Sequence, residues 1–168
     1  MAFSDIDIKK AIRKKEIVVE PLDEEQIKSA SIDLTLSDEW YFFKRGFLRG
    51  NVDLKKTGFE ETYEMKKSDT ITLKYGEMCL GKTTERIKLA ADIMGRLEGR
   101  SRYSIMGLVI HITSAIVQPG SNNRQVLEIV NLAPFTITLH KGMRISQVVF
   151  DRLESPTSKP YAKFGTIQ

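Results

Sequence analysis

The sequence is poor in the residues on which metal and thiol chemistry depend. It contains one cysteine, Cys79, and two histidines, His111 and His140, in 168 residues. A single cysteine forms no internal disulfide and is typical of a reducing compartment, so we expect a cytoplasmic protein. The histidines lack metal-ligand spacing and the paired cysteines of zinc-dependent hydrolases are missing, so a zinc site is poorly supported. Neither histidine shows the partner pattern of a serine or cysteine nucleophile triad either.

Long apolar runs are also missing, which excludes a membrane-spanning helix of roughly 18 residues. The opening "MAFSDIDIKKAIRKKE" contains acids and no continuous apolar segment, unlike a secretory signal. The length suits a single domain over residues 1–168. The net charge of +4 is mild. The basic cluster "KKAIRKKE" is typical of a solvated helix face, so we expect no nucleic-acid partner, and the charge weakly favours a small anionic ligand.

Local patterns predict a chain dominated by short strands. Ser4 and Asp7 have the spacing of a capping box, which predicts a helix over residues 4–15. A brief strand follows at "EIVVEP", and the alternation in "SIDLTLSDEWYFF" predicts another. Residues 46–69 are polar and predict a loop or an exposed hairpin. From "TITLKY" onward, turn residues separate the predicted strands "GLVIHITSAIV", "QVLEIVNL", "FTITLHKG" and "MRISQVVF".

The connections between the last strands are only a few residues long. A parallel crossover needs roughly a dozen residues, so these strands must be antiparallel or lie in facing sheets. The sequence therefore predicts a mainly β protein: a distorted β-barrel or β-sandwich of mostly antiparallel strands, with a few short helices at its margins.

One motif matches a nucleotide-binding pattern that the surroundings contradict. "GEMCLGKT", residues 76–83, fits the phosphate-binding loop G-x-x-x-x-G-K-[ST]. That loop requires a flexible turn between a buried parallel strand and a helix. Here the variable positions are largely apolar and crossover helices are missing downstream. We predict instead a turn at Gly76–Glu77 followed by a strand, "MCLGKT".

Glu128 is the most promising candidate for acid–base chemistry. The strand period of "QVLEIVNL" places it on one face with Val126 and Val130, opposite Leu127 and Ile129. A carboxylate flanked by valines is partly desolvated, which tends to raise its pKa and suits a general base. The alternative is that this face is exposed to solvent and Glu128 only decorates it. The pattern alone favours the second interpretation slightly.

Two further features have both a functional and a structural interpretation. His111 is predicted to share a strand face with Val109 and Thr113, where a lone histidine is more often a satisfied structural group. Arg100, Ser101 and Arg102 follow "GRLEG" and supply guanidinium forks and a hydroxyl, a suitable grip for phosphate. Arginines in turns are also common surface decoration, and the residues leave this choice open.

Taken in order along the chain, these segments resemble the dCTP deaminase family, within the trimeric dUTPase-like superfamily. The resemblance is carried by "SDIDIKKAIRKKEIVVEP", "SIDLTLSDEW", "CLGKTTERIKLAADI", "GRSRYSIMGL", "VQPG…VLEI" and "GMRISQVVFDRLESPTSKPY". It covers nearly the whole chain, and it rests on the order and spacing of the motifs rather than on any one of them.

The resemblance implies a dUTPase-like fold and a homotrimer with active sites between subunits. It implies a hydrolase that acts on the cyclic amidine of dCTP, releasing dUTP and ammonia in deoxynucleotide metabolism, with dUTP and dTTP as further candidate ligands. The family binds magnesium through the triphosphate and uses no metal at the base. Glu128 falls on the glutamate that activates water for attack at C4 of cytosine.

The resemblance also assigns the remaining site residues. The substrate-binding positions are Arg100, Ser101, Arg102, Tyr103, Ser104, Ile105, Gln118, Val126, Leu127, Tyr161, Lys163 and Gln168. His111, Thr113 and Ser114 are placed around Glu128, where they can support it. Among these, Val126 and Leu127 lie where backbone groups read the base.

Three positions depart from the family pattern. Ile105 stands where the family has an arginine, Arg102 stands where it has a second serine, and Gln118 stands where it has an aspartate. The aspartate activates water in dUTP pyrophosphatases, and an amide cannot deprotonate water. The sequence therefore favours a dCTP deaminase over a dUTP pyrophosphatase, a bifunctional enzyme or a non-catalytic nucleotide-binding relative.

Overall fold

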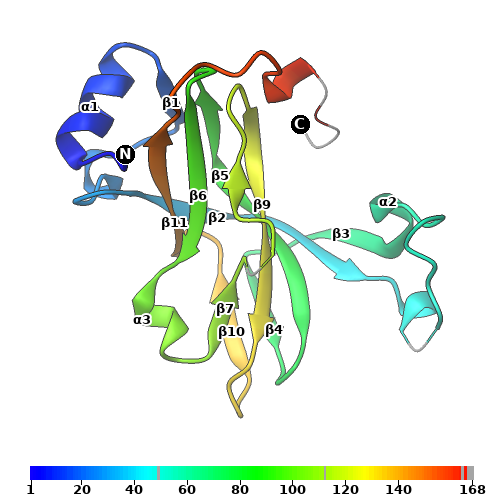
Figure 1. Cartoon of the computed structure of the whole chain (residues 1–168). Helices are drawn as coiled ribbons and strands as arrows, with labels where there is room; N and C mark the ends of the chain where they lie inside the picture. The colour runs from blue at the N-terminus through cyan, green and yellow to red at the C-terminus, as the bar shows by residue number, and fades with distance from the viewer. Residues whose placement is uncertain (49, 112, 164, 166–168) are drawn as a thin grey trace.

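The computed structural model describes residues 1–48, 50–111, 113–163 and 165. Strands make up most of the ordered elements, and the described residues also form three short α-helices and three 3₁₀ helices (η). Figure 1 shows the strands and the three α-helices. In chain order the elements are α1 (Asp5–Arg13), β1 (Ile17–Glu20), η1 (Glu24–Gln26), β2 (Ile32–Phe43), η2 (Arg45–Phe47), α2 (Phe59–Thr62), β3 (Tyr63–Lys67), β4 (Thr70–Leu73), β5 (Met78–Leu89), β6 (Ile93–Gly99), α3 (Ser101–Ser104), β7 (Leu108–Ile110), β8 (Ile116–Val117), β9 (Asn122–Asn131), β10 (Ile137–His140), β11 (Arg144–Arg152) and η3 (Tyr161–Lys163).

The strands form one curled sheet and one small sheet. The large sheet runs in the order β7-β9-β5-β2-β11-β6-β8, with β1 added to β5 and β3 added to β2, while β10 pairs with β4. Every strand pairing within the described residues is antiparallel. The predicted fold class, mainly β and antiparallel with short helices, is confirmed.

The first helix forms as its sequence predicts. The Ser4 hydroxyl accepts from the Asp7 backbone N–H at 3.3 Å, and the Asp7 carboxylate accepts from the Ser4 backbone N–H at 3.2 Å. Ile8 and Ala11 are buried against the sheet, while Arg13 and Lys14 are exposed. The basic cluster is therefore a solvated face. No helix within the described parts of the chain is long and apolar enough to cross a membrane.

The segment that matches a phosphate-binding loop is part of the sheet. Gly76 has a φ of 78° in a tight turn, and the chain enters β5 at Met78. β5 pairs with β1, β2 and β9, so "MCLGKT" lies within a paired strand, as predicted.

One row of residues across β2, β5 and β9 shows which face of the sheet packs against the core. Trp40, Gly81 and Leu127 are partners across β2, β5 and β9, and Trp40 and Leu127 are completely buried. A Cβ on Gly81 would lie only 2.8 Å from Ile129 Cδ1, because Trp40 and its neighbours fill this space. The adjacent row of Tyr41, Leu80 and Glu128 must therefore point to the opposite, outer face, because successive residues of a strand alternate.

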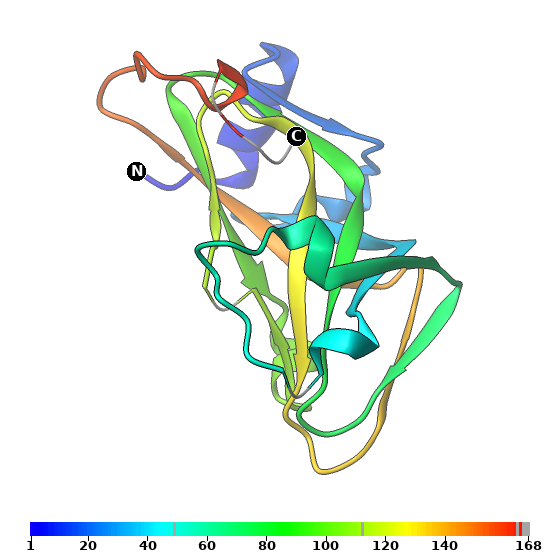
Figure 2. The same ribbon diagram turned by 90° about the vertical axis from the view of Figure 1, so that its right-hand side faces the viewer.

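Residues 46–69 contain more structure than a plain loop. They form η2, α2 and β3, and β3 pairs with the end of β2 through Phe43 and Tyr63. We call the described residues of this segment, 44–48 and 50–63, the arm. The arm projects to one side of the sheet (Figure 1), and seen from that side it crosses in front of β9 (Figure 2).

The prediction of one strand over "GLVIHITSAIV" is wrong. The structure divides it into β7, which pairs with β9, and β8, which pairs with β6 at the other end of the sheet. His111 has a φ of 57°, in the left-handed region, and turns the chain out of the ladder. His111 and Thr113 therefore do not share a strand face. A bond from the His111 backbone N–H to the Glu128 carbonyl at 2.8 Å holds this bend in place.

Candidate active site

Glu128 lies near the middle of β9 on the outer face of the sheet. It is half-buried, as are Val126 and Val130 on the same face, while Leu127 and Ile129 are completely buried. The Thr113 hydroxyl lies 2.8 and 2.9 Å from the two carboxylate oxygens of Glu128, and the Thr113 backbone N–H donates at 3.4 Å. The carboxylate is thus held in one orientation by the loop that follows β7.

His111 holds this loop against β9 through both ring nitrogens. Nδ1 accepts from the Glu128 backbone N–H at 3.4 Å, and Nε2 lies 2.7 Å from the Ser114 carbonyl oxygen. A peptide N–H only donates and a carbonyl only accepts, so the ring is the neutral tautomer with its proton on Nε2. The sequence interpretation of His111 as a satisfied structural group fits this geometry, and the structure brings Glu128, His111, Thr113 and Ser114 together.

Next to Glu128, one edge of β9 has no strand partner among the described residues. Both backbone groups of Glu128 point toward the His111 side, so those of Val126, two residues earlier, point to the same edge. Within the described residues, β7 covers this edge only from Ile129 to Asn131. Leu127 instead faces its partner Gly81 on β5. The backbone N–H and carbonyl of Val126 are therefore directed toward the open edge.

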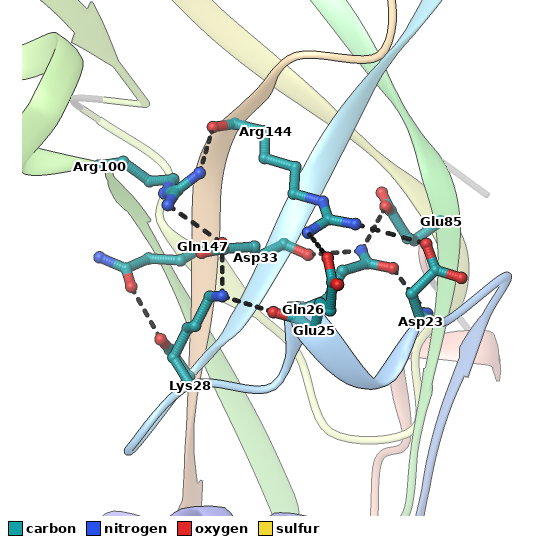
Figure 3. A network of polar contacts seen from close by, with 10 residues as sticks. Asp23, Glu25, Gln26, Lys28, Asp33, Glu85, Arg100, Arg144 and Gln147 are labelled. Carbon is teal, nitrogen blue, oxygen red and sulfur yellow. Dashed lines mark hydrogen bonds and ion pairs between the residues drawn. The ribbon is translucent and has the colours of Figure 1, made fainter.

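The turn predicted to grip phosphate begins with an arginine that already has protein partners. Arg100 is the N-cap of α3, and its guanidinium lies 3.2 Å from Asp33 Oδ2 and donates to the Arg144 carbonyl at 2.9 Å (Figure 3). Ser101 and Arg102 are exposed, and the Arg102 guanidinium lies 5.7 Å from the centre of the Tyr103 ring. Tyr103 itself packs against the core, and the Ser104 hydroxyl donates to the Arg100 carbonyl at 3.2 Å.

Asp33, which the sequence did not single out, is the centre of a buried polar network. Its side chain is 2% exposed, and Lys28 approaches the same oxygen at 3.8 Å. The Gln26 amide donates to the Asp33 carbonyl and to the buried Glu85 carboxylate, both at 2.8 Å. Figure 3 shows these groups around the junction of β2, β11 and the start of α3. Asp33 Oδ2 makes ion pairs but no well-aligned hydrogen bond.

A third set of predicted residues lies at the turn before β9. Gln118 is exposed, and the Tyr161 backbone N–H donates to the Pro119 carbonyl at 2.9 Å. Gly120 has a φ of 76° and no room for a Cβ, which would lie 2.5 Å from Pro160. The C-terminal segment is thereby docked on this turn. Lys163 is exposed, and Gln168 lies outside the described residues.

These sets remain separate within one chain. Among the described residues, no hydrogen bond or ion pair joins Glu128 to Arg100, Arg102 or Gln118. Ile105, at the end of α3, is 85% exposed, so the position has no role in this chain's own core.

An ion cluster not foreseen from the sequence lies further along the face of Glu128. Arg124 and Glu39 form a contact of 2.5 Å, and Lys82 lies 3.7 Å from the other oxygen of Glu39. Burial raises the pKa of Glu39, but the hydrogen bond from Arg124 and the charges of Arg124 and Lys82 outweigh burial and hold that pKa below its ordinary value.

Comparison with known proteins decides the family. The model of a family described as dCTP deaminase-like matches residues 2–153. The chain belongs to the dCTP deaminase-like family.

Similar proteins of this family include enzymes with two different names. The chain is 36% identical to the dCTP deaminase of Rhodospirillum rubrum, covering 99% of this chain and 90% of that protein. It is 37% identical to the dUMP-forming dCTP deaminase of Methanopyrus kandleri, covering 96% of this chain and 86% of that protein.

Solved structures show the same fold. The 2'-deoxycytidine 5'-triphosphate deaminase of Agrobacterium tumefaciens superposes with a TM-score of 0.70 at 21% identity, over 90% of this chain and 48% of that one. The chain thus spans about half the length of that protein. The EIAV dUTPase superposes with a TM-score of 0.55 at 15% identity, over 86% of this chain and 92% of that one. The dUTPase-like fold implied by the resemblance is confirmed.

Two of the positions at which the sequence is expected to depart from the family pattern, Arg102 and Ile105, lie close together at α3. Ile105 is the C-cap of α3 and keeps a helical backbone. Residues three apart on a helix lie on the same face, roughly 5–6 Å from each other. Arg102 and Ile105 therefore share a face of α3, which carries a guanidinium beside an apolar side chain.

Proposed function

We propose that this protein is a dCTP deaminase that hydrolyses dCTP to dUTP and ammonia, with Glu128 as general base and proton shuttle. The observation that carries the proposal is the Glu128 carboxylate, held by Thr113 on a half-buried face beside the open edge of β9. Such a group supplies what deamination of dCTP needs: a fixed base next to backbone groups that can hold a pyrimidine.

The Glu128 carboxylate alone can carry out the proton transfers of the deamination. Glu128 takes a proton from water as the water oxygen bonds to C4 of cytosine, and passes this proton to N3 of the ring. It then takes the proton of the new hydroxyl group and delivers it to the exocyclic amine. The C4–N bond breaks, ammonia leaves and the C4 carbonyl of uracil remains. The backbone groups of Val126 hold the base during these steps, whereas those of Leu127, which the resemblance also assigned to the base, face β5.

The proposal also includes a homotrimeric assembly and a magnesium ion. We place Ser101 and Arg102 of one subunit at the triphosphate held beside Glu128 of another, in a homotrimer, with Arg100 anchoring their turn through Asp33. Ile105 and Met106, at 85% and 54% exposed, form an apolar end of α3 suited to a subunit contact. Magnesium enters on the triphosphate, with no protein ligand, and the protein acts in the cytoplasm.

Subunit complementation tests this assembly. Glu128→Gln and Ser101→Ala are each expected to be inactive alone. After the two variants are mixed and allowed to exchange subunits, some interfaces combine an intact Glu128 with an intact Ser101, so activity returns. If the mixture stays as inactive as its components while mass analysis shows exchange, sites between subunits are contradicted.

The nature of the product is tested by incubating the protein separately with dCTP and dUTP, with magnesium, and resolving the products. Gln118 cannot deprotonate water, so we expect dUTP and ammonia from dCTP and no reaction of dUTP. Formation of dUMP and pyrophosphate would favour a bifunctional enzyme, the alternative suggested by relatives named dUMP-forming dCTP deaminases. Binding without any product would leave a non-catalytic nucleotide-binding protein.

A further inference from the structure

Four aromatic side chains gather where the arm meets the sheet. The Phe43 and Tyr63 rings lie 4.3 Å apart between centroids, Phe59 stacks on Tyr63 at 5.0 Å, and Tyr41 lies 5.9 Å from Phe59. They come from β2, α2 and β3, which are brought together by the pairing of β2 with β3. We call these four residues the aromatic cluster.

Strand register places this cluster on the same face as Glu128. Tyr41 is the partner of Leu80, and Leu80 is the partner of Glu128, so the three side chains point to one side of the sheet. Phe43 is two residues after Tyr41 and shares that side, as does its partner Tyr63. Because neighbouring strands lie about 4.8 Å apart, the Cα atoms of Tyr41 and Glu128 are separated by roughly 10 Å.

Two further observations show that the cluster closes toward Glu128. Leu80 points to the outer face between Tyr41 and Glu128, yet it is only 6% exposed, so side chains above the sheet cover it. Burial raises the pKa of Tyr63, and the charges of Glu128 and then Cys79 raise it further.

The cluster also leaves aromatic surface uncovered. Phe59 is 47% exposed and Phe43 is 39% exposed, although both lie in a stack of rings beside a half-buried carboxylate. Ligand sites combine apolar and aromatic walls with a few polar groups that fix orientation. The cluster supplies such a wall, while Glu128 and the open edge of β9 supply the polar groups.

We propose that the exposed ring face of Phe59, backed by Tyr63, binds the pyrimidine base beside Glu128, and that the arm thereby selects the base. This inference rests on the proposed function, because it places the reacting ring at Glu128. A planar base that presents C4 to the carboxylate and its edge to Val126 turns its ring face toward the cluster. The arm then contributes affinity for the base and excludes bulk water from the reacting carbon.

The test compares Phe59→Ala with Phe135→Ala. Phe135 is 52% exposed on the β9–β10 loop, so the same truncation is made at matched exposure outside the cluster. Stacking on a base is worth about 1–3 kcal/mol, so Phe59→Ala should raise the KM for dCTP about tenfold. Inorganic tripolyphosphate carries no base, and its Kd should be unchanged. Phe135→Ala should leave both constants unchanged.

Tyr63→Phe keeps the ring and removes the hydroxyl, so its KM should stay near that of the wild type. Phe59→Leu keeps apolar volume without a ring face, so it should raise KM less than Phe59→Ala does. Both variants should have the melting temperature of the wild-type protein.

Three results would overturn the inference while leaving the proposed function intact: a wild-type KM in Phe59→Ala, an equal loss of tripolyphosphate binding in that variant, or a rise in KM for Tyr63→Phe as large as for Phe59→Ala. A wild-type protein that neither binds nor converts dCTP would instead overturn the proposed function, and this inference with it.

Discussion

The polar groups around Asp33 and those around Glu128 are held in opposite ways. Asp33 is buried at the junction of β2, β11 and α3, where Arg100, Lys28 and Gln26 surround it (Figure 3). Glu128 is half-buried, is oriented by one threonine, and lies beside an unpaired strand edge. In the first arrangement the charged groups pair with one another within one chain. In the second, a carboxylate and backbone groups remain available to a ligand. The comparison separates a positioning network from a reacting one.

The sharpest way to break this comparison is Glu128→Gln. The amide keeps the shape of the side chain but cannot shuttle protons, so kcat for deamination should fall by a factor of about 10³ or more. The Kd for dCTP, measured by calorimetry, should change little because the binding contacts remain. Turnover close to the wild-type rate would contradict the assignment of Glu128.

Asp33→Asn tests the buried side of the comparison. The substitution leaves Arg100 and Lys28 without their shared anion, and should lower the free energy of unfolding by about 2–3 kcal/mol in urea denaturation. Asp151→Asn is the matched control, because Asp151 is 26% exposed and pairs with Arg96 at 3.5 Å. It should cost less than about 1 kcal/mol. Equal losses in the two variants would mean that Asp33 anchors no special network.

Thr113→Val tests whether the hydrogen bonds from Thr113 orient the Glu128 carboxylate. Valine matches the shape of threonine but removes the hydroxyl between the two carboxylate oxygens, so kcat should fall about tenfold, the equivalent of one hydrogen bond. Thr138→Val, at an exposed position of β10, serves as the control and should retain wild-type kcat. An unaffected kcat in Thr113→Val would show that the loop does not orient the base.

The smallest expected effect concerns the ion cluster of Glu39, Arg124 and Lys82. A carboxylate whose pKa is lowered in the folded state stabilises the fold above its unfolded pKa, and this stability is lost as pH falls through the folded value. The free energy of unfolding should therefore decrease below about pH 5. Arg124→Gln should lower stability at pH 7 by about 1 kcal/mol and make the decrease on acidification shallower. An unchanged pH dependence in the variant would rule out this pair as its cause.

Local patterns predicted local structure well. Ser4 and Asp7 fix the start of α1 because both partners of the capping box lie within four residues. The alternation around Glu128 placed it on the correct face of β9, because period and burial are properties of one strand. The prediction that residues 78–83 form a strand and not a phosphate-binding loop is confirmed for a similar reason. The apolar run around Cys79 is suited to a buried strand.

The errors and omissions involve residues distant in sequence. The bend at His111 depends on hydrogen bonds with Glu128, 17 residues later, so no local sequence pattern predicts it. Asp33 meets Arg100 only after β2 and β11 pair, so the network was not visible in the sequence. The resemblance supplied a list of site residues, and their division into separate sets became visible only with the fold.

The open edge of β9 has an evolutionary consequence. If Val126 reads the base with its main chain, no side-chain replacement at this position removes the reading groups, and only proline would delete the donor. Recognition of the base is then tolerant to mutation at its core. Changes in preference between related nucleotides must instead arise at neighbouring, replaceable surfaces, where single substitutions can be gained and lost without dismantling the strand.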